Sequence, residues 1–171
     1  MSLGRPFAAL WSANALSNLS DGLAFVTMPL LAASLTDDPR LIAGLATLYA
    51  LVRLLVVLPV GVYVDRLDRR TLIVTANLLR GLAVLGLAFS VQFGAGSLIA
   101  LYAVMAVVGT LESFADHAAV AMLPSLVRRA QFDKANARVA SAQLIADEFV
   151  GPPLGGLLFA VAVSAPVFAM G

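Results

Sequence analysis

Ionisable side chains interrupt several long apolar stretches of this chain. Five of them lie deep within such stretches: Asp21, Arg53, Arg80, Asp147 and Glu148. Glu112 lies somewhat nearer one end of its stretch, and Asp116 and His117 lie near a boundary. Uncompensated charge in hydrocarbon costs several kcal/mol, so such groups pair, reach water or become neutral. An acid removed from water holds its proton more tightly than in water. The chemistry that these residues could perform is therefore the loading of a proton on one side of a membrane and its release on the other.

Asp21 is the first choice among these acids. Asn14, Asn18 and Asp21 follow one another at spacings of four and three residues, so they share one face of a helix. Lipid cannot satisfy a polar stripe, which must therefore face a cavity or another helix. This stripe is predicted to line a path for protons or substrate.

The other ionisable residues each have a second interpretation. Glu112 and Asp116 are one helical turn apart and repel each other if both are charged. His117 is either a pH-sensitive partner of these acids or only a hydrogen-bonded residue. Arg53 and Arg80 either contact substrate or form structural salt bridges to neighbouring helices.

Asp147 and Glu148 are adjacent in the sequence. On a helix they point about 100° apart, so both are not expected to line one cavity.

The elements that must position these groups are membrane helices. Hydrophobic residues make up 61% of the chain and charged residues 12%, with a mean hydropathy of +0.95; ordinary globular chains have about 45–50% and 25%. A helix of about 20 residues crosses a hydrocarbon core of roughly 30 Å. The fold is therefore predicted to be all-α and integral to the membrane, with spans at 7–35, 41–64, 71–92, 98–119 and 139–161 and the start of a sixth at 165–171.

A charged stretch, Gly61–Arg70, separates the second and third spans. It carries three arginines and two aspartates, so it must lie in water or at the interface. Its pattern, Gly-x-x-x-Asp-Arg-x-x-Arg-Arg, resembles the signature loop of the major facilitator superfamily, Gly-x-x-x-Asp-Arg/Lys-x-Gly-Arg/Lys-Arg/Lys. The matching residues are Gly61, Asp65, Arg66, Arg69 and Arg70, and Asp68 stands where the family prefers glycine.

The resemblance implies that this stretch, called the gating loop below, holds the cytoplasmic side of a transporter closed in one state. Asp65 would bind a cationic side chain or a helix N-terminus, both of which favour a carboxylate. Arg69 and Arg70 would meet acidic groups near the end of the fourth span or anionic lipid, or would only fix the loop on one side.

A second motif lies in the fifth span. Gly151-Pro152-Pro153-Leu154-Gly155-Gly156 resembles the Gly-Pro-x-x-Gly-Gly antiporter motif of superfamily exporters. The alternative is ordinary close packing of helices, for which glycine is suited. The segments around Leu123–Val127 and Ala135–Ala137 also resemble the enterobactin-exporter subgroup, and together these resemblances imply efflux.

The lysines and arginines predict the orientation. Apart from Arg53 and Arg80, eight lie on the side of the N-terminus and the gating loop, and only Arg40 lies on the other. Because basic loops stay inside, the N-terminus is expected in the cytoplasm and the chain in the cell membrane, which it crosses several times.

Transporters of the superfamily typically have twelve spans in two halves. This chain is therefore expected to be a truncated piece of a transporter, a natural half with a second protein as partner, or a half that self-associates. The predicted function is the N-terminal half of a secondary exporter that moves a small amphiphilic molecule in exchange for protons. The alternative is a module without transport activity, acting as a homodimer, scaffold or partner-binding subunit.

Several other classes are not expected. The chain has no cysteine and one histidine, so disulfides and a metal site are not predicted. It has no enzyme motif, no phosphate-binding loop and no basic aromatic surface for nucleic acid, so neither catalysis, a cofactor nor nucleic-acid binding is expected. The expected partners are membrane lipid, protons, substrate and a second half or second copy.

Overall fold

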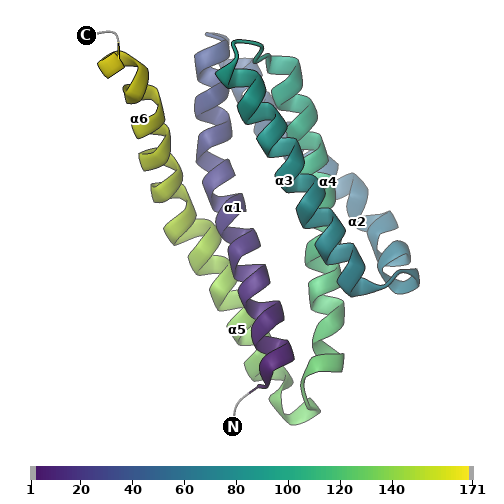
Figure 1. The fold of residues 1–171 in the computed structure, drawn as a ribbon. Helices are drawn as coiled ribbons and strands as arrows, with labels where there is room; N and C mark the ends of the chain where they lie inside the picture. Colours follow the sequence, from purple (N-terminus) through teal and green to yellow (C-terminus); the bar gives the residue numbers. More distant parts are fainter. Residues whose placement is uncertain (1–2, 170–171) are drawn as a thin grey trace. The chain divides into compact units, whose positions relative to one another are not determined.

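The computed structural model describes the backbone of residues 3–169 and the side chains of residues 3–161. Within these residues every regular element is a helix, and five helices are long and apolar enough to cross a membrane, which confirms the predicted fold class (Figure 1). The elements are α1 (Arg5–Leu35), α2 (Pro39–Arg66), α3 (Arg69–Gln92), α4 (Leu98–Leu126), a 3₁₀ turn η1 (Arg129–Gln131), α5 (Phe132–Leu144), a π-helical segment η2 (Ile145–Val150) and α6 (Gly151–Ala169).

Acidic residues cap the starts of α2 and α3, which follow short connections. Asp38 precedes α2 and accepts a hydrogen bond from the backbone N–H of Arg40 at 2.9 Å, with Pro39 at the first helical position. Asp68 precedes α3 and accepts from both the N–H and the hydroxyl of Thr71, at 2.8 and 2.6 Å. The gating loop is therefore mostly helical, and only two of its residues lie between α2 and α3.

Helix α4 extends past residue 119, the end expected for the fourth span. It continues to Leu126 and includes Pro124. A proline so close to a helix end removes one backbone hydrogen bond and affects only the last turn. Glu112 lies midway between the two ends of α4.

The fifth crossing is one continuous helical run of α5, η2 and α6. It begins at Phe132, inside the polar connection that precedes the fifth predicted span, and α5 buries Ala135 and Val139 while its charged residues are exposed. Residues 165–171, where a sixth span is expected to start, lie at the end of α6 and beyond the described side chains. That start stays a prediction.

The chain forms two compact parts, Met1–Leu31 with Leu126–Gly171, and Ala32–Ser125. In the first part, the N-terminal portion of α1 lies beside α5, η2 and α6 (Figure 1). In the second part, Val60 and Val64 of α2 pack with Ala118 of α4, and Leu72 and Ile73 of α3 complete this core.

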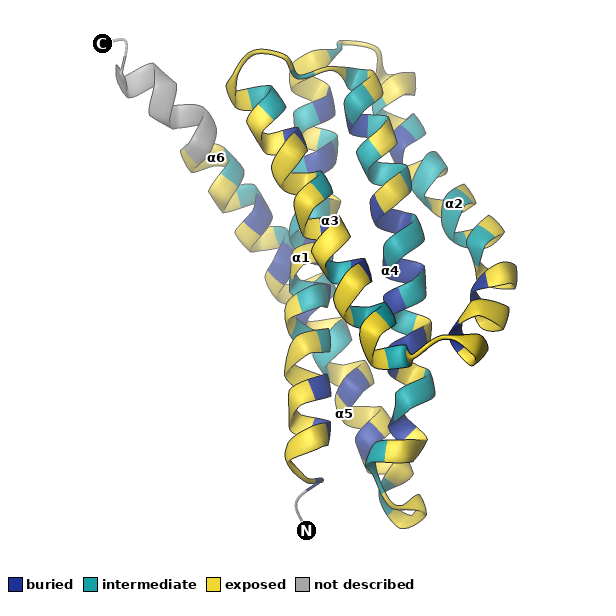
Figure 2. Cartoon of the chain, turned by 45° about the vertical axis from the view of Figure 1, so that its right-hand side comes forward, coloured by how far each residue is buried: buried dark blue, intermediate teal, exposed yellow. Residues whose placement is uncertain are grey.

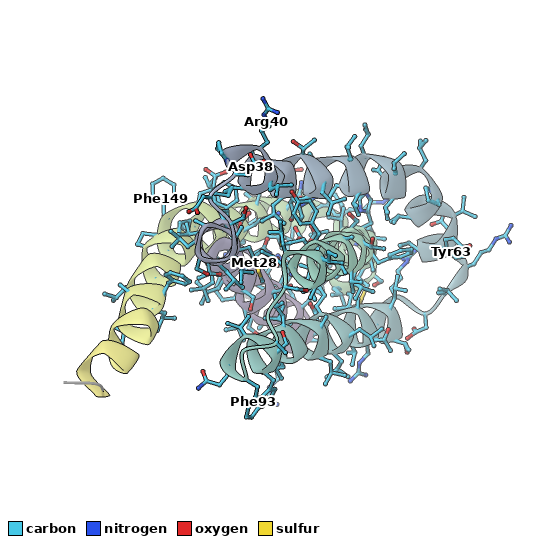
Figure 3. All side chains as sticks on the ribbon, turned by 90° about the horizontal axis from the view of Figure 1, so that it is seen from above. Met28, Asp38, Arg40, Tyr63, Phe93 and Phe149 are labelled. Carbon is cyan, nitrogen blue, oxygen red and sulfur yellow. The ribbon has the colours of Figure 1, made fainter. Side chains whose placement is uncertain are left out.

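Many large apolar side chains are exposed, as in a protein surrounded by lipid. Figure 2 shows exposed residues along each labelled helix. Leu58 and Ile99 are 81% and 83% exposed. Phe93 and Phe149 each point away from the helices of their own part (Figure 3). Several charged and polar side chains are buried instead: Asn18, Arg80, Glu112 and Ser113. This distribution suits a membrane and is the reverse of that in a water-soluble bundle.

Candidate functional site

Four side chains of α2 and α4 form a hydrogen-bonded group, called the charged network below: Tyr49, Arg53, Glu112 and Asp116. Arg53 Nη1 lies 2.5 Å from Glu112 Oε1, and Tyr49 Oη donates to Glu112 Oε2, also at 2.5 Å. Arg53 Nη1 donates to Tyr49 Oη at 3.0 Å, and its Nη2 lies 3.5 Å from Asp116 Oδ2. Both oxygens of Glu112 are therefore engaged, while Asp116 has one longer contact.

Helical spacing and one glycine bring the network together. Tyr49 and Arg53 are one turn apart on α2, as are Glu112 and Asp116 on α4, so each pair shares a face. Gly109 lies one turn before Glu112, and a Cβ there would be 3.1 Å from Cδ2 of Tyr49. The absence of that atom lets the tyrosine ring approach α4. The guanidinium of Arg53 lies 5.6 Å from the centre of the same ring, within reach of a cation–π interaction.

Arg80 of α3 balances the charge of the network. It is buried, donates to Asn77 Oδ1 at 3.3 Å, and interacts electrostatically with Glu112 and Asp116. Two arginines thus face two carboxylates near the middle of their helices, where isolated charge would be most costly. This geometry agrees with the interpretation of Arg53 as a salt-bridge residue. Contact of Arg53 with substrate stays a prediction.

The members of the network are buried to different degrees. The side chain of Glu112 is 6% exposed, that of Asp116 is 23% exposed and that of Arg53 is 40% exposed. Asp116 therefore combines the longer ion pair with a larger exposed fraction than Glu112, and it is held less firmly by its neighbours.

His117, next to Asp116, has its own backbone partner. Its Nδ1 lies 2.7 Å from the carbonyl oxygen of Ser113, and because a carbonyl only accepts, this nitrogen donates. The ring is exposed. This contact corresponds to the hydrogen-bonded interpretation of His117, and a role in proton transfer stays a prediction.

The polar stripe of α1 is partly satisfied within its own helix. Asn18 is buried, and its Nδ2 donates to the backbone carbonyl of Asn14 at 2.7 Å. Asp21 is half-buried on the next turn of this face. The stripe therefore exists as predicted from spacing, but the bond of Asn18 needs no substrate to explain it.

Three glycines allow α1 to cross the η2–α6 segment at very close range. A Cβ on Gly22 would be 2.5 Å from the carbonyl oxygen of Asp147, one on Gly151 would be 2.5 Å from Cα of Gly22, and one on Gly155 would be 2.7 Å from the carbonyl oxygen of Leu23. Real Cβ atoms do not approach other atoms so closely. Two residues of the predicted antiporter motif therefore act in helix packing, whereas a Cβ on Gly156 would make only an ordinary contact, 3.9 Å from Val26.

The π-helical segment η2 directly precedes the two prolines of the same motif. Pro152 and Pro153 have no N–H to donate to the preceding turn, and the N–H of Gly151 bonds to the carbonyl of Ala146, five residues back. Asp147 and Glu148 lie inside this segment; the first is half-buried and the second exposed. The two carboxylates thus have different surroundings, and such π-helical turns often occur at functional sites.

A hydrogen bond ties one side chain of the gating loop to α4. Arg69 Nη1 donates to the backbone carbonyl of Ala121 at 2.8 Å, in the turn of α4 that Pro124 weakens, rather than to an acid. Asp65 is exposed, and among the described residues its carboxylate has no hydrogen bond or ion pair. A Cβ added to Gly61 would meet nothing within 4 Å.

Two more residues of the loop, Arg66 and Arg70, are exposed. Asp68, where the family pattern has glycine, is the cap of α3 described above. The hydroxyl and N–H of Thr71 hold the pKa of Asp68 below its ordinary value, because both stabilise the charged form.

Comparison with known proteins identifies the family. The family model described as Major Facilitator Superfamily matches residues 10–171. The chain belongs to the major facilitator superfamily. A search of curated proteins and a search of solved structures gave no match.

Membership of the superfamily, together with five membrane-crossing helices, makes this chain a multi-pass membrane transport domain. Within the described part of this superfamily member, no cluster of three or more histidine, aspartate or glutamate residues is arranged to hold a metal ion.

Three contributors to these sites in this superfamily member were not predicted from its sequence: Tyr49, Gly22 and Gly109. Tyr49 could have been found, because it lies one helical turn before Arg53 and a tyrosine there can bridge an arginine and an acid. The two glycines carry no such sign, because their importance depends on which helix lies opposite.

Proposed function

We propose that the chain is the N-terminal half of a secondary active transporter that exports a small amphiphilic molecule in exchange for protons by alternating access. A second half is needed for transport. The observation that carries this proposal is that Arg53 contacts two carboxylates one helical turn apart, near the middle of the membrane helices.

The unequal contacts of the network suggest its order of protonation. With both acids ionised, Arg53 is shared and the carboxylates repel each other. A proton on Asp116, the more exposed acid with the longer contact, removes that repulsion and leaves Arg53 to Glu112. Asp116 would thus exchange the proton while Glu112 and Tyr49 hold the arginine. Asp21 on the polar stripe of α1 is the second candidate for this role.

The remaining motifs fit an alternating-access cycle. Asp65 is exposed and Gly61 has open space beside it, so both are free to meet a surface from a second half. The glycine crossing of α1 with α6 supplies close, smooth backbone contact, and η2 supplies a turn whose hydrogen bonds depart from the regular helix. Export rather than import, and the enterobactin-exporter type, rest on the sequence resemblances alone.

In the experiment, the chain and the protein encoded by a neighbouring reading frame are reconstituted together in proteoliposomes. A pH dye inside the vesicles reports proton movement while fluorescent amphiphilic dyes are tested as substrates. Proton-linked dye movement is expected only with both halves, and Asp116→Asn should abolish it. Asp133→Asn is the matched control, because Asp133 is an exposed aspartate outside the network.

Two outcomes would count against this function. Unchanged proton-linked movement in Asp116→Asn would remove Asp116 from the mechanism, and Asp21→Asn would be tested next. A stable self-dimer with no proton-linked movement under any pairing would instead favour the non-transporting module acting as homodimer, scaffold or partner-binding subunit.

A further inference from the structure

A groove lies between the N-terminal end of α1 and α5, within the first compact part. Its volume is about 1120 Å³. Apolar side chains form much of its surface, among them Phe7, Trp11 and Ile145. Neither the charged network nor the gating loop contributes to it, so it is separate from the sites described above.

The charge of the groove has one sign. Arg5, Lys134 and Arg138 line it and are all exposed. None of the described residues that line the groove is acidic, and Asp133, although adjacent to Lys134 in the chain, is not among them. Three cations therefore surround an apolar surface.

Trp11 marks the depth of the groove in the membrane. Its Nε1 donates to the backbone carbonyl of Arg138 at 3.1 Å, which ties α1 to α5. Tryptophan is enriched at the level of lipid headgroups, where its ring is apolar and its N–H finds a polar partner. The guanidinium of Arg138 is exposed and has no hydrogen bond or ion pair among the described residues, so it is available to a ligand.

We propose that this groove binds an anionic phospholipid. The phosphate would lie against Arg5, Lys134 and Arg138, and an acyl chain would follow Phe7 and Ile145. Basic pockets between membrane helices favour anionic headgroups, and each cation near the surface contributes about fivefold in affinity. The apolar surface distinguishes this ligand from a free phosphate, which would leave that surface exposed to water.

The test uses Trp11, the single tryptophan of the chain, as a probe inside the groove. The full chain is reconstituted in phosphatidylcholine vesicles containing brominated phosphatidylglycerol or, in parallel, brominated phosphatidylcholine, and quenching of Trp11 is titrated. Phosphatidylglycerol should associate at least about fivefold more strongly. The double variant Lys134→Gln with Arg138→Gln should lose most of this preference.

The matched control is Arg128→Gln with Arg129→Gln. It removes the same charge from residues that follow α4 and do not line the groove, so its lipid preference should equal that of the unaltered chain. Helical circular dichroism checks that each variant is folded. If the groove variant does not fold, the lipid preference of Arg5→Gln is compared with that of the unaltered chain instead.

Three results would overturn the proposal. Equal quenching by the two lipids would mean that the groove does not select charge, and an equal loss in the control variant would mean that only total charge matters. Displacement by soluble glycerophosphoglycerol as effectively as by the lipid would indicate a phosphate site. A Trp11 signal that depends on protein concentration but not on lipid type would indicate that a second copy covers the groove.

Discussion

Arg53 Nη1 lies 2.5 Å from Glu112 Oε1, and each residue is near the middle of a helix that is long enough to cross a membrane. This ion pair joins α2 to α4 at the depth where a lone charge would be most costly. Its geometry leads to expectations for stability as well as for transport.

Glu112→Gln should lower the free energy of unfolding by about 2–3 kcal/mol. Breaking a buried ion pair costs about 3–5 kcal/mol, and the smaller value is expected here because the side chain of Arg53 is 40% exposed. Denaturant unfolding in micelles, followed by helical circular dichroism, measures the change.

The double variant Arg53→Met with Glu112→Met is the control for that prediction. Removing both charges together should recover much of the loss, because the two removed charges cancel and Asp116 keeps its electrostatic interaction with Arg80. Strictly additive losses in Arg53→Met, Glu112→Met and the double variant would show that the two residues do not stabilise each other.

Gly22→Ala should weaken the contact of α1 with η2 and α6. The new Cβ would lie 2.5 Å from a backbone carbonyl that cannot move aside cheaply, so a loss of about 1–3 kcal/mol is expected. Gly86→Ala is the matched control, because a Cβ there meets nothing within 4 Å and alanine favours the helix. Thermal unfolding in micelles compares the two, and equal melting temperatures would mean that the close crossing does not contribute to stability.

The fold could be predicted further than the site. Long apolar stretches and charged turns indicate five membrane helices, and these are present. The helix ends differ, because a helix continues beyond the hydrocarbon into the interface; α4 reaches Leu126 and α2 reaches Arg66 for this reason. The hydropathy of the sequence indicates where a helix leaves the hydrocarbon, but it does not indicate where the backbone hydrogen bonds of that helix end.

The site could be predicted less fully than the fold. Arg53, Glu112 and Asp116 could each be recognised as a charge that needs a partner, since lipid offers none. Which partner each one finds depends on how α2 and α4 lie against each other, and no local pattern fixes this. Tyr49 is different, because its place one helical turn before Arg53 could have indicated a bridging role.

Asp68→Ala should loosen the first turn of α3, and Asp68→Gly should do so less, because glycine is a tolerated cap. The effect depends on pH. Since the pKa of Asp68 is lowered in the fold, its contribution to stability is complete above the ordinary value of 3.8 and is lost as the pH falls through the lower folded value. The amide proton of Thr71, followed by NMR, should therefore titrate with a midpoint below pH 3.8. A midpoint at or above that value would contradict the cap.

Tyr49→Phe isolates the hydroxyl that bridges Arg53 and Glu112. The ring would still pack against Gly109, but Glu112 Oε2 would lose its donor, so the free energy of unfolding should fall by about 1–2 kcal/mol. Tyr63→Phe is the matched control, because Tyr63 is 53% exposed and packs edge-on against Phe114 through its ring, which phenylalanine retains. Its change should stay within about 0.5 kcal/mol. Combined with Glu112→Gln, the Tyr49→Phe change should cost less than it does alone, because the carboxylate that its hydroxyl serves is already gone. If both tyrosine variants lost the same stability, the effect would come from general loss of a hydroxyl and the bridge would have no special role.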